Sequence, residues 1–342
     1  MAVDWADSAE WSCNMKYRRF GKTDWKVSEV GLGCWQIGGA DWGEVSDAAA
    51  FEVLNAALDT GVNFLDTADV YGLGRSEELI GRFLKTRSDS VLVATKLGRF
   101  PDPGWPANFE YETIFKHVEA SLKRLGRDHI DLIQLHCVPT EVLRRGEVFD
   151  SLRRFKETGQ IKHFGVSVES MEEAAICLKQ EGLASLQIIF NLFRQKPVKA
   201  LFDQALAKQV GLIVRLPLAS GLLSGKFTLE TQFAETDHRN YNRNGEQFNV
   251  GETFAGIEFE KAIGLVEKVR EIVPEGIHLA DAALRWCLDH PAVSVIIPGA
   301  KRAAQVKQNT AVSEREPLPD SVHQSLKDFY QAEVSGLIRG PY

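Results

Sequence analysis

The feature that most constrains the fold is a regular alternation of short apolar runs with amphipathic helical patterns along almost the whole 342-residue chain. The runs are continuously apolar, which is typical of strands buried on both faces of a parallel sheet. Eight runs are predicted to be strands: 29–34, 63–66, 91–96, 132–136, 164–168, 186–190, 212–216 and 293–297.

The helical patterns between these runs have recognisable ends. Ser46 is the expected N-cap of one helix and Gly61 its stop, Ser76 is the expected N-cap of a second, and Gly126 ends a third that starts at Glu112. Further helices are expected to begin near Val142, Ser170, Pro197, Glu258, Leu279 and Arg302.

Eight strand–helix alternations without a Pro- or Ser-rich linker predict an α/β fold, a (β/α)8 TIM barrel. Residues 17–26 predict a short N-terminal β-hairpin at the barrel floor, and the long connections 98–111 and 227–256 are expected at the C-terminal rim. A dinucleotide-binding doubly wound sheet is disfavoured, because the glycine string starting at Gly31 lacks its final glycine at Gln36. We expect a flexible extension at residues 1–14 and a single barrel domain at 15–342.

Composition excludes several classes of protein. Forty basic and 47 acidic side chains give a net charge of -7, which argues against a nucleic-acid or anionic-membrane surface. We expect no membrane span and no signal peptide, because no apolar run has the necessary length or position. The five scattered cysteines predict neither a disulfide framework nor a metal site, and they favour a cytoplasmic protein.

Polar side chains stand at the ends of three successive predicted strands. Asp66, Lys96 and His136 each terminate an apolar run, and Tyr71 follows Asp66 in the next loop. Barrel enzymes assemble their active sites from these strand ends, so we expect the four side chains to converge.

The chemistry of the four groups is complementary. An ammonium at Lys96 is expected to lower the pKa of Tyr71, which makes the phenol a usable proton donor. Asp66 would keep the buried Lys96 charged, and His136 would orient a substrate carbonyl. A proton delivered to a carbonyl oxygen needs a nucleophile at carbon, and hydride from a reduced nicotinamide is a natural choice.

From Tyr17 to about Asn309 the chain resembles the aldo-keto reductases. The resemblance implies a (β/α)8 barrel, a nicotinamide cofactor across its mouth, and a catalytic tetrad of Asp66, Tyr71, Lys96 and His136 with Tyr71 as proton donor. The motifs are GLGCW at 31–35, NFLDTADVYG at 63–72, ATK at 94–96, IDLIQLH at 130–136, GVS at 165–167, residues 187–191, GLLSGK at 221–226 and IPGAK at 297–301.

The resemblance also implies cofactor contacts. Ser167 and Gln187 match positions that bind the nicotinamide carboxamide, and Phe190 matches an aromatic residue that stacks on the ring. Lys301 and Arg302 suit a 2′-phosphate and favour NADP(H), although departures at Gln305 and Gln308 leave NAD possible. The other expected cofactor residues are Gly33, Cys34, Trp35, Leu216, Pro217, Leu218, Ser220, Gly225, Lys226, Gly299, Gln305, Gln308 and Asn309.

The expected substrate is a small carbonyl compound or alcohol held by Trp35, Tyr71, His136 and Trp105. Trp42 and Tyr241 are further candidates for aromatic walls. The candidates for binding a carboxylated substrate are Arg99, Arg239 and Arg243.

The predicted function is an NADP-dependent oxidoreductase that interconverts aldehydes or ketones, some of them sugar-derived, and alcohols. We expect a monomer or weak homo-oligomer. One alternative is a low-turnover NADP(H)-binding redox-sensing or regulatory subunit, and another is a Schiff-base aldolase with Lys96 as nucleophile.

Overall fold

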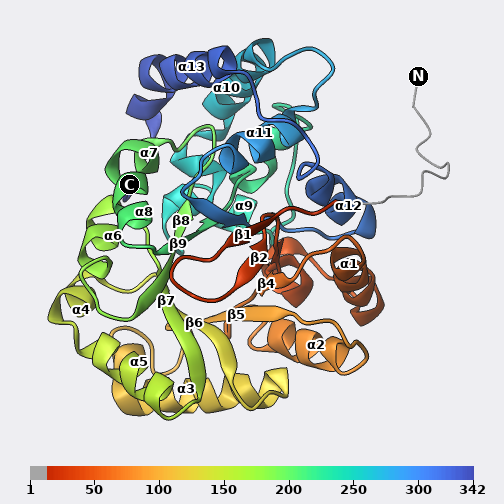
Figure 1. The fold of residues 1–342 in the computed structure, drawn as a ribbon. Helices are drawn as coiled ribbons and strands as arrows, with labels where there is room; N and C mark the ends of the chain where they lie inside the picture. Colours follow the sequence, from red (N-terminus) through yellow and green to blue (C-terminus); the bar gives the residue numbers. More distant parts are fainter. Residues whose placement is uncertain (1–13) are drawn as a thin grey trace.

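The computed structural model describes residues 14–342 and shows eight parallel strands arranged as a barrel inside a ring of helices (Figure 1). The first and last strands meet through parallel bridges that join Val30 to Ile296 and Gly33 to Gly299. The strands are β3 (Leu32–Gly33), β4 (Phe64–Asp66), β5 (Leu92–Leu97), β6 (Ile130–His136), β7 (Ile161–Ser167), β8 (Leu183–Ile189), β9 (Gly211–Arg215) and β10 (Val293–Ile296). The predicted (β/α)8 barrel is confirmed, with a strand at each of the eight predicted runs.

Helices separate the strands, and most of them cover the outside of the barrel (Figure 1). They are α1 (Asp47–Asp59), α2 (Arg75–Leu84), α3 (Tyr111–Leu125), α4 (Thr140–Arg145), α5 (Glu147–Glu157), α6 (Met171–Cys177), α7 (Lys196–Ala200), α8 (Phe202–Ala207), α9 (His238–Tyr241), α10 (Phe259–Ile272), α11 (Leu279–Leu288), α12 (Ala303–Ala311) and α13 (Asp320–Phe329). None of the helices in residues 14–342 is both long and apolar enough to cross a bilayer.

Most of the predicted helix ends agree with the structure. Ser46 caps α1 by accepting a hydrogen bond from the Ala49 N–H, and Gly126 ends α3 with a φ of 64°. Ser76, however, is not an N-cap, because α2 begins at Arg75 after Gly74. The Ser76 hydroxyl is buried and donates to the Cys34 carbonyl oxygen at 2.9 Å, so it ties α2 to the loop after β3 instead.

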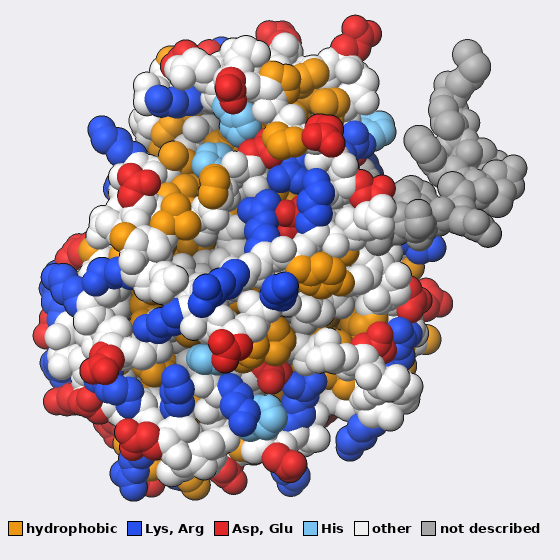
Figure 2. Space-filling view, in the orientation of Figure 1, with side chains coloured by type: hydrophobic (Ala, Val, Ile, Leu, Met, Phe, Trp, Pro, Cys, Tyr) orange, Lys and Arg blue, Asp and Glu red, His pale blue; other side chains and the backbone are white. Residues whose placement is uncertain are grey.

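The predicted hairpin closes one end of the barrel. Strands β1 (Tyr17–Arg19) and β2 (Lys26–Ser28) pair antiparallel, and Phe20 between them is fully buried. The Phe20 ring lies 5.6 Å from that of Phe64 and belongs to an apolar cluster whose members come from the hairpin and the barrel strands. Around this end of the molecule, basic and acidic side chains are interspersed (Figure 2). The hairpin therefore fills the floor, which leaves the opposite end, where the strands terminate, for a site.

The segment 227–256 forms a structured cover at the rim. It carries α9 and two short 3-10 helices, η5 (Val250–Glu252) and η6 (Phe254–Gly256). Its end is fixed to the C-terminal residues, because the N–H of Arg339 donates to the Gly256 carbonyl oxygen. The expected flexible extension at residues 1–14 lies, apart from Asn14, outside the described residues.

Candidate active site

The four predicted tetrad residues come together at the C-terminal ends of β4, β5 and β6. The buried Lys96 Nζ donates to Asp66 Oδ1 at 2.5 Å and to the Thr67 carbonyl oxygen at 2.8 Å. It also lies 3.2 Å from the Tyr71 hydroxyl. The ring of His136 contacts that of Tyr71 edge-on, with centroids 5.9 Å apart. Parallel pairing explains this convergence, since neighbouring strands end at the same edge of the barrel.

Asp66 is held in place by more than the lysine. Its second oxygen, Oδ2, accepts hydrogen bonds from Gln134 Nε2 at 3.0 Å and Gln187 Nε2 at 2.8 Å. A carboxylate with this many donors is fixed in orientation. Gln187 was predicted as a ligand of the nicotinamide carboxamide, and in this structure its amide N–H groups face Asp66. Gln134 stands inside an apolar run, and sequence reasoning missed this role.

Burial changes the expected acidity of Tyr71. Burial, the largest influence, raises the pKa of Tyr71, and the neighbouring Lys96 only partly offsets this effect. The sequence-based prediction that Lys96 lowers the pKa of Tyr71 below its ordinary value is therefore wrong, because the net shift is upward. Burial by itself would lower the pKa of Lys96, but Asp66 and Tyr71 raise it above its ordinary value. The pair at neutral pH is thus a phenol beside an ammonium, which is the state a proton donor needs.

His136 is neutral. Burial, and then the positive charges of Arg99, Lys96 and Arg215, hold its pKa well below the ordinary value. Its Nδ1 is buried and has no hydrogen-bond partner among the described residues. A neutral imidazole donates from one ring nitrogen and accepts at the other, so it can still form a hydrogen bond with a substrate.

A cavity of about 380 Å³ opens beside this group. Tyr71, Asp66 and His136 line one part of it, and the loops after β3, β9 and β10 line much of the rest. The predicted cofactor residues that line it are Gly33, Cys34, Trp35, Gln187, Leu216, Pro217, Leu218, Ser220, Lys226, Gly299, Lys301, Arg302 and Gln305.

Five predicted cofactor residues do not line the cavity: Ser167, Phe190, Gly225, Gln308 and Asn309. Phe190 is the clearest correction, because its ring stacks on Trp286 of α11 with centroids 4.7 Å apart. Side chains alternate across a strand, so Phe190 faces the helix layer when Gln187, three residues earlier, faces the barrel interior.

Cationic side chains gather at the end of the cavity formed by the loop after β10. Lys226, Arg239, Lys301 and Arg302 all line it. Burial, and then the charge of Arg239, lower the pKa of Lys301, and Asp237, which pairs with Arg239, offsets only part of this effect. These residues fit the phosphates of a dinucleotide, and the glycines of the lining allow close backbone approach. Sequence reasoning did not assign Arg239 to the cofactor.

Helix α9 and the 3-10 helix η2 (Ala40–Trp42) contact each other at the cavity, and we call this contact the α9–η2 bridge. The Tyr241 hydroxyl donates to Asp41 Oδ1 at 2.5 Å, and the Arg239 guanidinium lies 4.8 Å from the centre of the Trp42 ring. Trp35 donates from its indole N–H to Asp41 and stacks on Tyr71 with centroids 5.7 Å apart.

Of the predicted substrate residues, Trp35, Tyr71 and His136 line the cavity, whereas Trp105 does not. Trp105 is 51% exposed and donates from its indole N–H to the Gly98 carbonyl oxygen. It stabilises its own loop.

The structure adds a charged group that sequence reasoning identified only in part. Arg99, Arg215 and Glu252 line the cavity together with Tyr71 and His136. Arg99 was a candidate for binding a carboxylate, but Arg215 ends a strand and Glu252 lies in a polar loop far along the chain. A polar residue that ends an apolar run was the available signal for Arg215, and it is the same signal that identified Lys96.

Comparison with known proteins agrees with this geometry. The sequence model of the aldo/keto reductase family matches residues 29–331. Aldo-keto reductase YhdN of Bacillus subtilis is 31% identical over 86% of this chain and 87% of its own. Two solved structures superpose with TM-scores of 0.76. The aldo-keto reductase AKR11C1 from Bacillus halodurans (holo form) is 28% identical over 94% of this chain and 98% of its own. The glycerol dehydrogenase AKR11B4 from Gluconobacter oxydans is 30% identical over 95% and 98%. The chain therefore belongs to the aldo/keto reductase family.

Proposed function

We propose that the protein is an NADP(H)-dependent oxidoreductase that interconverts an aldehyde or ketone and the corresponding alcohol, with Tyr71 as the proton donor. One observation carries the proposal. The Tyr71 hydroxyl lies 3.2 Å from the ammonium of Lys96, in a cavity that also contains the cations suited to a dinucleotide. The similar structure described as a glycerol dehydrogenase supports including alcohol oxidation, so both directions belong to the proposal.

The chain's own residues orient the carbonyl group and supply the proton. A bound nicotinamide would supply the hydride that reaches the carbonyl carbon. Neutral His136 orients the carbonyl oxygen by a hydrogen bond, and Tyr71 gives that oxygen its proton. Lys96 stabilises the phenolate that remains, and Asp66 keeps Lys96 charged throughout. Trp35, stacked on Tyr71, limits the motion of the phenol and covers it from water.

The test measures turnover of a panel of aldehydes and ketones, with the loss of NADPH fluorescence as the readout. We expect turnover with NADPH and slower turnover with NADH. Tight NADPH binding with no turnover of any compound in either direction would contradict the proposal and support the low-turnover regulatory alternative. The aldolase alternative requires Lys96 to be uncharged, and the 2.5 Å contact with Asp66 argues against it.

Cofactor preference depends on Lys301 and Arg302. Lys301→Ala and Arg302→Ala should each weaken NADPH binding by roughly tenfold while changing NADH binding little, because only NADPH carries a 2′-phosphate. Fluorescence titration of both cofactors measures the difference. Lys307→Ala, an exposed lysine on α12, is the matched control and should alter neither affinity. Equal losses for the two cofactors would contradict the assignment.

The pH dependence follows from the two shifted groups. Because the pKa of Tyr71 is raised, the phenol stays protonated, and carbonyl reduction should be flat from about pH 6 to about pH 9. Alcohol oxidation needs the phenolate as base, so its rate should rise with pH through the same range. The lowered pKa of His136 predicts no inflection near about pH 6.5 in either direction. Profiles of kcat/KM test this, and a reduction rate that falls with a midpoint near about pH 7 would contradict it.

A further inference from the structure

Two arginines share one carboxylate oxygen at the catalytic end of the cavity. Arg99 follows β5, Arg215 ends β9, and the Nη1 atom of each lies 3.3 Å from Glu252 Oε1. The side chains of Arg99 and Arg215 are 19% and 11% exposed, so both guanidiniums are largely removed from water. They also lie close enough to His136 for their charges to lower its pKa.

The hydrogen-bonding capacity of these arginines is mostly unused. A guanidinium carries five N–H donors. Within residues 14–342, Arg99 makes one hydrogen bond, the long one to Glu252, and places its guanidinium 5.2 Å from the centre of the Phe248 ring. Arg215 reaches Glu252 and, at 3.8 Å, the sulfur of Cys137, and its buried Nε has no partner in the part of the chain that the structure describes. Buried donors without acceptors are costly unless a ligand supplies the acceptors.

The local charges do not cancel. Burial alone would raise the pKa of Glu252, but Arg99 and Arg215 outweigh that effect and lower it, so Glu252 is ionised. Burial and the charge of Glu252 raise the pKa of Glu169, whose Oε1 has no partner among the described residues. Burial also raises the pKa of the Cys137 thiol to about 12. Two cations therefore face one firmly ionised carboxylate.

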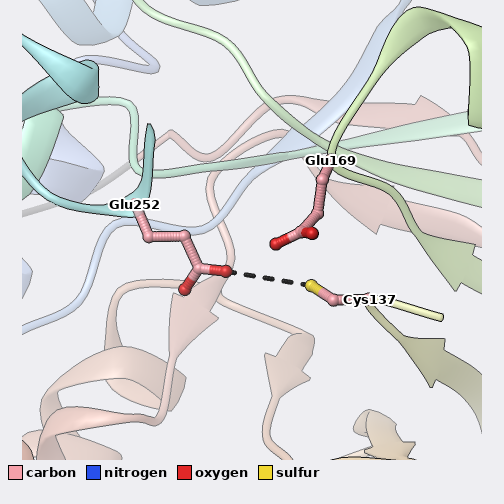
Figure 3. A group of neighbouring side chains, drawn as sticks. All are labelled: Cys137, Glu169 and Glu252. Carbon is pink, nitrogen blue, oxygen red and sulfur yellow. Dashed lines mark hydrogen bonds between the residues drawn. The ribbon is translucent and has the colours of Figure 1, made fainter. Parts of the chain in front are cut away.

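The same place contains a geometry that could hold a metal ion, formed by Cys137, Glu169 and Glu252 (Figure 3). Their ligand atoms lie within 4.8 Å of one another. A cation there would have to compete with Arg99 and Arg215 for Glu252, and the thiol would have to lose its proton although burial and the carboxylates of Glu169 and Glu252 raise its pKa. The electrostatics favour an anion over a cation.

We propose that the substrate carries a carboxylate, which Arg99 and Arg215 bind while its carbonyl group faces Tyr71 and His136. The substrate class is thus the formyl or oxo acids and the matching hydroxy acids. Planar guanidiniums with free N–H groups match a carboxylate in geometry as well as in charge. This inference rests on the proposed function, because it assigns the substrate of the same site.

The experiment compares para-formylbenzoate with its uncharged methyl ester as substrates of the full-length protein with NADPH. We expect kcat/KM to favour the carboxylate by about tenfold or more. Arg99→Met and Arg215→Met should each reduce this preference by roughly tenfold, mainly through a higher KM for the carboxylate. Glu252→Gln removes the competing anion and should increase the preference several-fold. A substitution that merely damaged the site would not produce these opposite directions.

Arg243→Met is the matched control. Arg243 lies in the segment 227–256, as Glu252 does, but it does not line the cavity. Its guanidinium lies 4.7 Å from the centre of the Phe259 ring. Its loss removes one positive charge and should leave the preference unchanged. An equal or higher kcat/KM for the ester, or a preference that survives Arg99→Met and Arg215→Met, would overturn the inference.

A second measurement separates this inference from the proposed function. Calorimetric titration of the protein with NADP+ present should show binding of benzoate and none of benzamide, with the benzoate affinity lost in Arg99→Met. Arg99-dependent benzoate binding without any aldehyde turnover would uphold the carboxylate site and refute the proposed function. Turnover of both aldehydes without a preference or benzoate binding would uphold the function and refute the carboxylate site.

Discussion

Tyr71→Phe should reduce the single-turnover rate of carbonyl reduction by about a hundredfold to ten-thousandfold, while NADPH binding stays nearly unchanged. The substitution removes the hydroxyl that faces Lys96 and leaves the ring, so the contacts with Trp35 and His136 remain. The loss therefore falls on proton transfer. Single-turnover measurement of NADPH oxidation reports the chemical step, and fluorescence titration reports cofactor affinity.

The control for this experiment is Tyr111→Phe, a tyrosine on α3 whose ring stacks on Phe155 far from the cavity. It loses the same hydroxyl and should turn over as the unaltered protein does. A Tyr71→Phe protein that retained its single-turnover rate would show that the proton comes from another group, and the assignment of the tetrad would fail.

Asp66→Asn should lower the free energy of unfolding by about 3–5 kcal/mol, which is among the largest effects of a single substitution. The reason is that the ammonium of Lys96 stays buried and loses its charge partner. Urea unfolding followed by tryptophan fluorescence measures the change. The double variant Asp66→Leu with Lys96→Met should be more stable than Asp66→Asn, because it removes both charges and leaves neither unpaired.

The exposed pair of Lys261 and Glu258 provides the comparison. Their side chains are 57% and 49% exposed, and Lys261→Met should cost less than about 1 kcal/mol. If Asp66→Asn cost no more than Lys261→Met, the buried pair could not be the charge-coupled unit described above.

Much of the fold could be predicted because strands buried on both faces appear in the sequence as continuous apolar runs. Asp66, Lys96 and His136 are polar residues that end such runs, so they could be assigned to the candidate active site from the sequence. Phe190 was assigned to the cofactor by the family resemblance alone. Alternation of side chains counted from Gln187 places it on the helix side, where it stacks on Trp286.

Features set by distant parts of the chain were beyond prediction. Serine is a common N-cap residue, yet the Ser76 hydroxyl donates a hydrogen bond to the carbonyl oxygen of Cys34, 42 residues earlier. The raised pKa of Tyr71 depends on burial, which the loop carrying Tyr71 does not encode by itself. Glu252 lies between Arg99 and Arg215 only because the segment 227–256 folds back across the rim.

The α9–η2 bridge has a kinetic consequence. Asp41 accepts hydrogen bonds from both Tyr241 and Trp35, so its carboxylate, together with the contact between Arg239 and Trp42, joins α9 to the loop after β3 beside the cavity. We expect a bound dinucleotide to leave only after the hydrogen bond between Tyr241 and Asp41 opens. Release of spent cofactor, rather than hydride transfer, would then set the steady-state rate, and the first catalytic cycle would run faster than all the cycles that follow it.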